Sequence, residues 1–439
     1  MKKYFISGAM LAGLMSLAAC SNDEGVVADN NGAEQQFTIT LASSGDRATR
    51  AAADRTLESE AAGQSIEKVT LVVRSQDDNK VVYIHTLDNW NDTATDYDTN
   101  GHGKKLTFTI PKADKLGAGS YVVTAVGYNE GNYTLSLPNK GDVVDKNITA
   151  TTPTGAEAKE VFAGEQKFNV TADKKIEGTD ASKAIQSVDV ALHRQVAGAY
   201  GYFTSIPAKI GETEVVSIRM VSRSKNTVLT FGSFNSSFTT TDANVMYMVN
   251  GSVPATKTAK FLNGEEANVL FSAKIADWFP GGDENNDGVY DKKDTNWTTP
   301  YTTGSYLKGS VFASNFIVPF SATQGKSTLE LQLLDATGNV LYAWPVKLDA
   351  SNDQISKTGE TASADLFGAG TAMGFAETAD VFSLFRNHIY SIGIHKQGTT
   401  NPDKTDPGTD EPTDLSKIQN VVIRVNDNWE ALHHMSIDE

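Results

Sequence analysis

Six loop residues between Asp283 and Asp294 have a spacing that is typical of a calcium site. Oxygen side chains stand at loop positions one, three, five, nine and twelve, and Gly288 lies at position six, where the backbone must turn sharply. EF-hand loops use this spacing, with a backbone carbonyl at position seven, to surround Ca²⁺ with oxygen. The sequence therefore predicts a structural calcium ion, with a chance acidic loop as the alternative. The predicted ligands are Asp283, Asn285, Asp287, Val289, Asp291 and Asp294.

Catalytic motifs are missing from the sequence. It contains no His-Glu-x-x-His, no Gly-x-Ser-x-Gly and no phosphate-binding loop. The seven histidines are scattered, and the His433-His434 pair near the end is more often incidental in proteins than metal-binding. The formal net charge of −16 argues against nucleic acid as a partner. We therefore expect a protein that is not an enzyme.

The first twenty residues are typical of an export signal that ends in a lipid attachment site. Lys2 and Lys3 precede the short apolar run Phe5–Leu17, and Ala18-Ala19 lead directly into Cys20. This pattern resembles a bacterial lipobox, in which the cysteine thiol receives a covalent lipid. An ordinary secretory signal followed by a chance cysteine is the alternative. Since Cys20 is the only cysteine, the fold contains no internal disulfide and must be held by packing.

An arginine-containing segment follows the first alternating run, 37–42. Phe37, Ile39 and Leu41 share one parity, which is typical of a strand with one buried face. The small, polar residues that follow predict an exposed, protease-sensitive loop, with a plain surface loop as the alternative. The candidate cleavage bonds are Arg47-Ala48 and, as the runner-up, Arg50-Ala51, with Arg55 third.

The tail of the chain has a similar alternating run behind a polar linker. Residues 399–417 are almost all Pro, Asp, Thr, Gly and Lys, which predicts a flexible linker. Beyond it, Val421, Ile423, Val425 and Trp429 share one parity. Such a strand has two options: it folds back onto its own sheet, or it completes the sheet of another molecule.

Most of the remaining chain reads as short strands separated by Gly, Asn, Asp and Pro, and this predicts an all-β fold. About 350 ordered residues exceed one ordinary sandwich, so two domains are expected. The polar stretch 172–183 is the best candidate boundary. A short helix is expected over 362–370. The predicted strands are 37–42, 69–74, 81–85, 106–110, 121–128, 188–192, 200–206, 215–220, 228–231, 269–273, 311–320, 329–334, 340–348 and 388–395.

In their order along the chain, these features resemble the FimA-type fimbrillin family, the major pilins of type V pili. The resemblance includes the lipobox, the Arg47-Ala48 site, the segments 66–73 and 119–126, and Leu192-His193-Arg194-Gln195-Val196-Ala197. Its most specific part is Arg386-Asn387-His388-Ile389-Tyr390, followed by the linker and the last strand.

The resemblance implies two transthyretin-like β-sandwich domains and a C-terminal donor strand on a flexible linker. It implies an outer-membrane lipoprotein precursor that an arginine-specific surface protease cuts, and a subunit that then joins a cell-surface fimbrium. The strand of Phe37, Ile39 and Leu41 would leave, and the last strand of the next identical or related subunit would replace it. Anchor and tip subunits would be further partners, and the receptors are unknown. The expected division is 1–19 signal peptide, 20–50 propeptide, 51–182 first domain, 183–396 second domain, and 397–439 linker with donor strand.

Two other functions stay open at this point. One is a minor tip or anchor subunit of the same kind of fimbrium. The other is a surface glycan-binding lipoprotein, which needs an exposed aromatic platform. Trp90, Trp278 and Trp297 occur in polar, loop-like sequence and are the candidates for such a platform.

Overall fold

The structure is a computed structural model, described over residues 34–41, 66–96, 104–143, 148–152, 158–177, 187–231, 251, 253–301, 306–348, 378–384, 386, 388–395, 410–416 and 421–426. Within these ranges almost all regular structure is strand. The exceptions are the single-turn helix α1 (Trp90–Thr93) and the 3-10 turns η1 (Lys112–Asp114) and η2 (Ile275–Asp277). The all-β prediction is therefore confirmed. In this part of the chain, no helix has the length and apolar character needed to cross a membrane.

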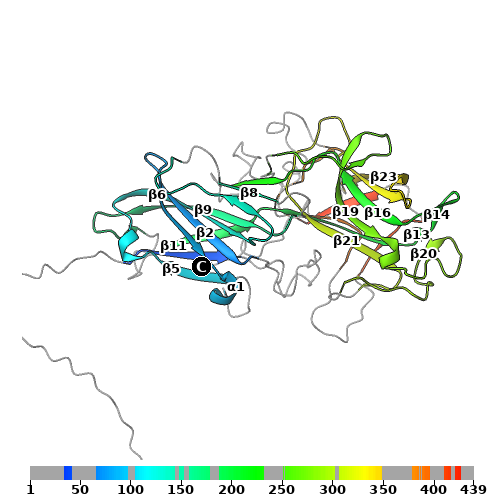
Figure 1. Ribbon diagram of the computed structural model, residues 1–439, viewed down its shortest axis with the longest axis horizontal. Coiled ribbons are helices and arrows are strands. Elements are labelled where there is room, and N and C mark those ends of the chain that lie inside the picture. Colours follow the sequence, from blue (N-terminus) through cyan, green and yellow to red (C-terminus); the bar gives the residue numbers. More distant parts are fainter. Residues whose placement is uncertain are drawn as a thin grey trace, which may run out of the picture.

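The first lobe is a β-sandwich built from the strands in the N-terminal part of the chain (Figure 1). Its strand order is β3-β2-β6-β9-β11-β1-β5-β4, and β10 (Ile176–Glu177) pairs with β9. The strands are β1 (Gln36–Leu41), β2 (Lys68–Ser75), β3 (Val81–Leu87), β4 (Thr95–Asp96), β5 (Lys104–Thr109), β6 (Gly119–Tyr128), β9 (Phe162–Val170) and β11 (Ser187–Arg194).

Strand β6 is largely apolar on both faces because it lies between two hydrophobic clusters. Val123 and Ala125 point into the core of the first lobe, whereas Val126 and Tyr128 belong to a second cluster at the junction with the other lobe. Because successive side chains on a strand point to opposite faces, a strand between two cores must be apolar throughout. Residues 121–128 are accordingly all buried.

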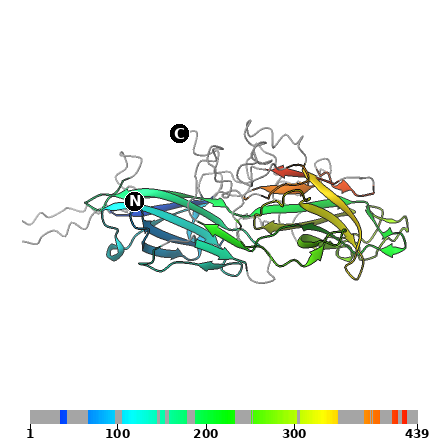
Figure 2. The same ribbon diagram turned by 90° about the horizontal axis from the view of Figure 1, so that it is seen from above.

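The second lobe is also a sandwich, with the order β18-β19-β16-β22-β23-β26-β24-β12-β21 (Figure 2). Its core contains apolar side chains from nearly all of these strands. The strands are β12 (Ala197–Thr204), β16 (Ser217–Ser222), β18 (Ala259–Lys260), β19 (Glu266–Lys274), β21 (Ser310–Ile317), β22 (Leu329–Leu334), β23 (Val340–Leu348), β24 (Ile389–Ile392) and β26 (Val421–Asn426). Short pairs outside this order are β13 (Ile206–Pro207) with β20 (Val289–Tyr290), and β14 (Lys209–Ile210) with β15 (Thr213–Glu214).

A small sheet joins the two lobes. β7 (Thr134–Ser136) and β8 (Ile148–Thr151) come from the first half of the chain, and β17 (Val228–Phe231) from the second half pairs with β8. The junction core buries residues of both halves. The lobes therefore share backbone hydrogen bonds and a hydrophobic cluster.

The chain passes from the sheet of the first lobe to the sheet of the second lobe later than the expected boundary between residues 182 and 183. β11 would belong to the second domain under that division, yet it pairs with β1 and β9 in the first lobe. The chain crosses to the second lobe between Arg194 and Ala197. The boundary was misplaced because the polar stretch 172–183 contains β10, which pairs with β9 in the first lobe.

The predicted strands all coincide with or overlap observed strands, but β9 and the short strands β4, β7, β8, β10, β14, β15, β18, β20 and β25 were missed. The longest of these is β9. Its sequence FAGEQKFNV does not alternate at its start, because Gly164 lies where β9 passes very close to β11. A Cβ atom on Gly164 would lie 1.9 Å from the Ala191 carbonyl oxygen. Glycine is the residue that permits such a close approach. The predicted helix over 362–370 lies outside the described residues.

Candidate functional site

Strand β1 completes the first lobe as a single strand between two neighbours (Figure 1). It runs parallel to β11 and antiparallel to β5, and all six of its residues have a partner on both sides. An isolated strand parallel to its neighbour requires a long connection, because a hairpin joins only antiparallel strands. β1 therefore fills a slot beside β11 that a simple turn from β11 could not close, and its antiparallel neighbour β5 begins only at Lys104.

The two faces of β1 interact differently with the slot. Phe37 and Ile39 are fully buried, and the Phe37 ring packs edge-on against Phe168 with centroids 5.5 Å apart. On the outer face, Thr38 Oγ1 lies 3.1 Å from Thr107 Oγ1, and it donates to Ser187 Oγ at 3.3 Å. Burial of each of the two apolar side chains contributes about 1.5–3 kcal/mol. β1 is thus held by apolar contacts inside and polar contacts outside.

Gln35 is a buried polar residue at the start of this slot, and sequence analysis did not identify it. Its side chain is fully buried, and its amide nitrogen donates to the carbonyl oxygens of Leu116 and Lys174, each at 3.0 Å. Its amide oxygen accepts the Leu116 N–H at 2.8 Å. The Gln35 backbone carbonyl accepts the Ile110 N–H at 2.8 Å. A single glutamine therefore satisfies backbone groups from two loops as well as the end of β5.

Strand β26 occupies a similar slot in the second lobe. It is parallel to β23 and antiparallel to β24, the same combination that surrounds β1. Among the described residues, β23 pairs with 421–423 and β24 pairs with 424–426. Val421 is fully buried, whereas Val422 is 43% exposed. Of the two options for the last strand, the single chain shows the one in which it folds back onto its own sheet.

The segment before β26 is docked on the second lobe, so the predicted flexible linker 399–417 is wrong for residues 410–416. Asp410 Oδ2 accepts a hydrogen bond from the Tyr202 hydroxyl at 3.1 Å and lies 3.2 Å from His395 Nδ1. Glu411 and Ile394 exchange two backbone hydrogen bonds of 2.8 Å. β25 (Thr413–Asp414) pairs with β12, and Leu415 is buried. Composition alone missed these contacts because they depend on a surface formed by distant strands.

Several predicted site residues lie outside the described residues. These are the lipidation candidate and the cleavage candidates, together with the last tryptophan of the tail: Cys20, Arg47, Ala48, Arg50, Ala51 and Trp429. Leu41, Ile423 and Val425 lie in strands whose backbone pairing is described, although their side chains are not.

The proposed aromatic platform does not form. Trp90 and Trp278 have exposed fractions of 0% and 1%, and only Trp297 is partly exposed. Trp278 packs against Trp297 and Tyr301 at ring distances of 6.2 and 5.8 Å. Polar neighbours in the sequence were misleading because these rings anchor loops to the cores. The prediction that the three tryptophans form an exposed glycan platform is therefore wrong.

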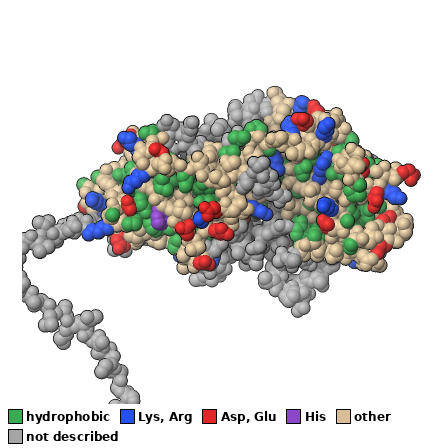
Figure 3. Space-filling model, viewed as in Figure 1, with side chains coloured by type: hydrophobic (Ala, Val, Ile, Leu, Met, Phe, Trp, Pro, Cys, Tyr) green, Lys and Arg blue, Asp and Glu red, His purple; other side chains and the backbone are tan. Residues whose placement is uncertain are grey.

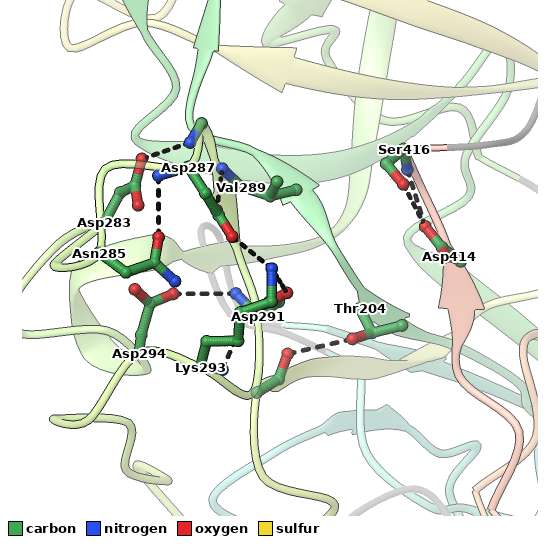
Figure 4. A network of polar contacts seen from close by, with 12 residues as sticks. Thr204, Asp283, Asn285, Asp287, Val289, Asp291, Lys293, Asp294, Asp414 and Ser416 are labelled. Atoms are coloured by element: carbon green, nitrogen blue, oxygen red, sulfur yellow. Dashed lines mark hydrogen bonds and ion pairs between the residues drawn. The ribbon is translucent and has the colours of Figure 1, made fainter.

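The acidic loop 283–294 is tightly folded around its own side chains (Figure 4). Asp283 Oδ2 accepts the Gly288 N–H at 2.9 Å, and Gly288 has the positive φ (87°) that its position was expected to need. The buried Asp294 carboxylate accepts backbone N–H groups of Glu284 and Asp291. The loop therefore turns as the calcium-loop spacing predicts.

The acidic side chains do not converge into a metal cage. Among the described residues, no three His, Cys, Asp or Glu side chains are placed to hold a metal ion. Instead, the Lys293 ammonium group lies 2.5 Å from Asp287 Oδ2 and 3.6 Å from Asp291 Oδ2. Its hydrogen bond lowers the pKa of Asp287. Asp283 Oδ1 is buried and accepts no hydrogen bond within the described part of the chain.

Two segments that carried the family resemblance meet at the junction of the lobes. The guanidinium of Arg194 is fully buried and donates to Glu160 Oε1 through Nε at 3.1 Å and Nη2 at 2.7 Å. Arg386 Nη1 donates to the Arg194 carbonyl oxygen at 3.2 Å, and His388 Nδ1 lies 2.7 Å from the Arg386 carbonyl. Sequence analysis missed Glu160, because no local pattern links it to Arg194.

The outer surface carries both signs of charge. On the face shown in Figure 3, basic and acidic side chains are interspersed among the coloured residues, and no broad region has one sign alone. A surface of this kind provides no track for a nucleic-acid backbone on the face in view. The slots that hold β1 and β26 therefore remain as the candidate functional sites.

No family model matches the sequence, and no curated protein matches it either. Among solved structures, the chain is similar to a proposed adhesin of Bacteroides thetaiotaomicron (9% identity, 91% of this chain and 97% of that one, TM-score 0.39). It is also similar to two proteins of Porphyromonas gingivalis. The fimbrial anchor protein Mfa2 has 8% identity, coverage of 82% and 90%, and a TM-score of 0.34. The tip fimbrial protein Mfa3, with a C-terminal truncation, has 10% identity, coverage of 81% and 94%, and a TM-score of 0.32. Likenesses at this level establish no family, so function is argued from the chain's own geometry.

Replacing Gln35 by alanine is expected to destabilise the first lobe. The substitution removes the side-chain partner of the buried Leu116 N–H and of the Leu116 and Lys174 carbonyls, which costs about 1–3 kcal/mol. Gln36→Ala is the matched control, because the Gln36 side chain forms only exposed contacts. Urea unfolding followed by circular dichroism measures both variants. Equal stability of the two variants would contradict the role assigned to Gln35.

Replacing Glu160 by glutamine is expected to destabilise the chain by about 3–5 kcal/mol, because it leaves a buried guanidinium without its counter-ion. Glu130→Gln removes an exposed partner of Lys68 and should change stability by less than about 1 kcal/mol. Differential scanning calorimetry of both variants tests this difference. A small effect of Glu160→Gln would show that the ion pair does not stabilise the junction.

Proposed function

We propose that this chain is a structural subunit, a pilin, of a bacterial surface fimbrium, and that it polymerises by exchange of strands between copies. The single observation that carries the proposal is the slot of β1. The strand pairs with two neighbours along its whole length, yet only the segment that follows it joins it covalently to the rest of the lobe. A cut in the segment that follows would leave β1 held by non-covalent contacts alone.

Removal of β1 would create a site that another strand must fill. The emptied slot would expose unpaired backbone groups of β11 and β5 along six residues, together with the apolar surface around Phe168. Unpaired strand edges of this kind bind other strands. The last strand of a second copy has the required alternation at Val421, Ile423 and Val425.

The single chain shows the last strand in a closed position. Among the described residues, β23 pairs with 421–423 of this strand and β24 with 424–426. In the slot of β1, a strand of the same length can pair with both neighbours throughout. The closed form would then protect the strand until a slot opens.

The remaining parts of the proposal follow from the sequence. The precursor would be a lipoprotein anchored through Cys20, and an arginine-specific surface protease would cut after Arg47 or Arg50. That cut would separate the lipid-bearing segment and β1 from the body of the subunit. Identical or related subunits, with tip and anchor subunits at the ends, would complete the fimbrium.

A minor tip or anchor subunit is the second candidate function. An anchor would keep its N-terminal segment, so intact lipidated chain recovered from fibres would favour that role. The paired strand β26 favours a stalk subunit, because a terminal tip has no further copy to which it must donate a strand. A glycan-binding lipoprotein is less well supported, since Trp90 and Trp278 are buried.

Limited cleavage with an arginine-specific protease should convert the purified precursor into ladders on unheated denaturing gels. The reason is that cleavage frees the slot of β1 for the last strand of another copy. N-terminal sequencing of the product should begin at Ala48 or Ala51. A chain with Arg47, Arg50 and Arg55 replaced by glutamine is the uncleaved control.

Deletion of residues 418–439 should abolish the ladders, while the docked segment 410–416 remains. Because β26 also completes the second lobe, circular dichroism must first show that the shortened chain is folded. Ladders that persist after this deletion would eliminate the last strand as the donor.

We also propose that the loop 283–294 binds a structural calcium ion. The support is its ligand spacing, the turn at Gly288, and the buried Asp283 Oδ1 that accepts no hydrogen bond among the described residues. Calcium would have to displace the Lys293 ammonium from Asp287 and Asp291. The lysine would thus act as an internal competitor of the ion.

Calcium should raise the melting temperature of the chain, and chelation should reverse the increase. Asp287→Ala combined with Asp291→Ala should remove this response, because two oxygen ligands are lost. Lys293→Gln should lower the calcium concentration needed for half of the effect. A melting temperature that does not respond to calcium in the parent chain would rule the site out.

A further inference from the structure

We propose that Gln419 of a second copy takes the buried position of Gln35 and thereby fixes the register of the exchanged strand. This inference rests on the proposed strand exchange. It identifies the groups that would recognise the incoming strand, namely the Leu116 N–H and the carbonyls of Leu116 and Lys174. These groups surround the start of the slot of β1.

The position demands a primary amide. Two carbonyl oxygens need donors and one N–H needs an acceptor, and the carboxamide of Gln35 supplies both kinds of group. The exposed fraction of Gln35 is 0%, and that of Leu116 is 4%. Water therefore has little access to the two Leu116 groups while the slot is filled, whereas the Lys174 carbonyl belongs to an exposed residue. A strand that brought an apolar residue to this position would leave buried polar groups unsatisfied.

The last strand carries an amide at the corresponding spacing. In β1, Gln35 stands two residues before Phe37, and in the tail Gln419 stands two residues before Val421. When the two segments QQFTITL and QNVVIRV are superposed, Val421, Ile423 and Val425 take the positions of Phe37, Ile39 and Leu41. In this one register, the apolar residues and the glutamine of the last strand both coincide with those of β1.

The neighbouring registers fail at this position. A slip by two residues in one direction places Val421 at the position of Gln35 and Asp427 at that of Leu41. A slip in the other direction places Lys417 in the polar pocket and Gln419 in the apolar position of Phe37. A slip by one residue turns Arg424 toward the core. Only the register with Gln419 in the pocket satisfies both the apolar and the polar positions.

The direction of the strand follows from the same groups. β26 already runs parallel to one neighbour and antiparallel to the other, as β1 does. A reversed strand that kept Val425 and Ile423 inside would bring Asp427 to the pocket. A carboxylate only accepts hydrogen bonds, so it would face the two carbonyl oxygens without a donor. The amide pocket thus selects the direction as well as the register.

Disulfide crosslinking measures the register directly. Thr38 and Thr107 are opposite each other and their hydroxyl oxygens are 3.1 Å apart, and Val422 takes the place of Thr38 in the proposed register. A full-length chain with Thr107→Cys and Val422→Cys should therefore form disulfide-linked ladders after cleavage. Thr107→Cys with Asn420→Cys, and Thr107→Cys with Arg424→Cys, are the matched controls for slipped registers, and the second also reports a reversed strand.

Gln419→Leu in the full-length chain tests the amide itself. The fraction of polymer that dissociates at a given time and temperature should increase about tenfold or more, because buried polar groups lose their partners. Asn420→Ala, one residue away, should change dissociation by less than about twofold, as is usual for surface substitutions.

The outcomes separate the inference from the function on which it rests. If cleaved chains form no ladders at all, strand exchange itself is wrong. If ladders form but crosslink through Asn420→Cys or Arg424→Cys, or if Gln419→Leu polymers are as stable as the parent, the role of Gln419 is wrong while strand exchange stands.

Discussion

The structure depends on one constraint: a strand in the middle of a sheet must satisfy backbone groups on both of its sides. β1 does this for β11 and β5 along its whole length, and Phe37 and Ile39 close the core beneath it. The first lobe therefore cannot lose β1 without exposing hydrogen-bonding groups and apolar surface together. The first lobe therefore needs a strand in this position to satisfy its backbone groups and cover its core.

The second lobe uses the same solution at the other end of the chain. β26 lies between a parallel and an antiparallel neighbour, so the two terminal strands occupy similar slots in the two lobes. Among the described residues, β26 pairs with β23 over 421–423 and with β24 over 424–426, and Val422 is exposed on its outer face. The docked residues 410–416 hold the preceding segment against β12 and His395.

Between the slots, the junction couples the lobes. The β8–β17 pair and the shared hydrophobic cluster cross from one half of the chain to the other, and the buried Arg194–Glu160 ion pair lies in the first lobe next to the crossing. Arg386 reaches the same place from near the end of the second lobe. Because these contacts are buried, they couple the two lobes to each other.

The sequence by itself determined the local features: the strands with one buried face, the Phe37 and Val421 alternations, and the turn at Gly288. These depend on periodicity and on conformational preference, which neighbouring residues encode. Only the tertiary structure decided the roles of Gln35, Glu160 and Asp410, the burial of Trp90 and Trp278, and the crossing between lobes after Arg194. Each of these depends on partners tens to hundreds of residues away, such as Leu116 for Gln35 and Tyr202 for Asp410. Sequence periodicity carries no information about such partners, because they meet only when the sheets are assembled.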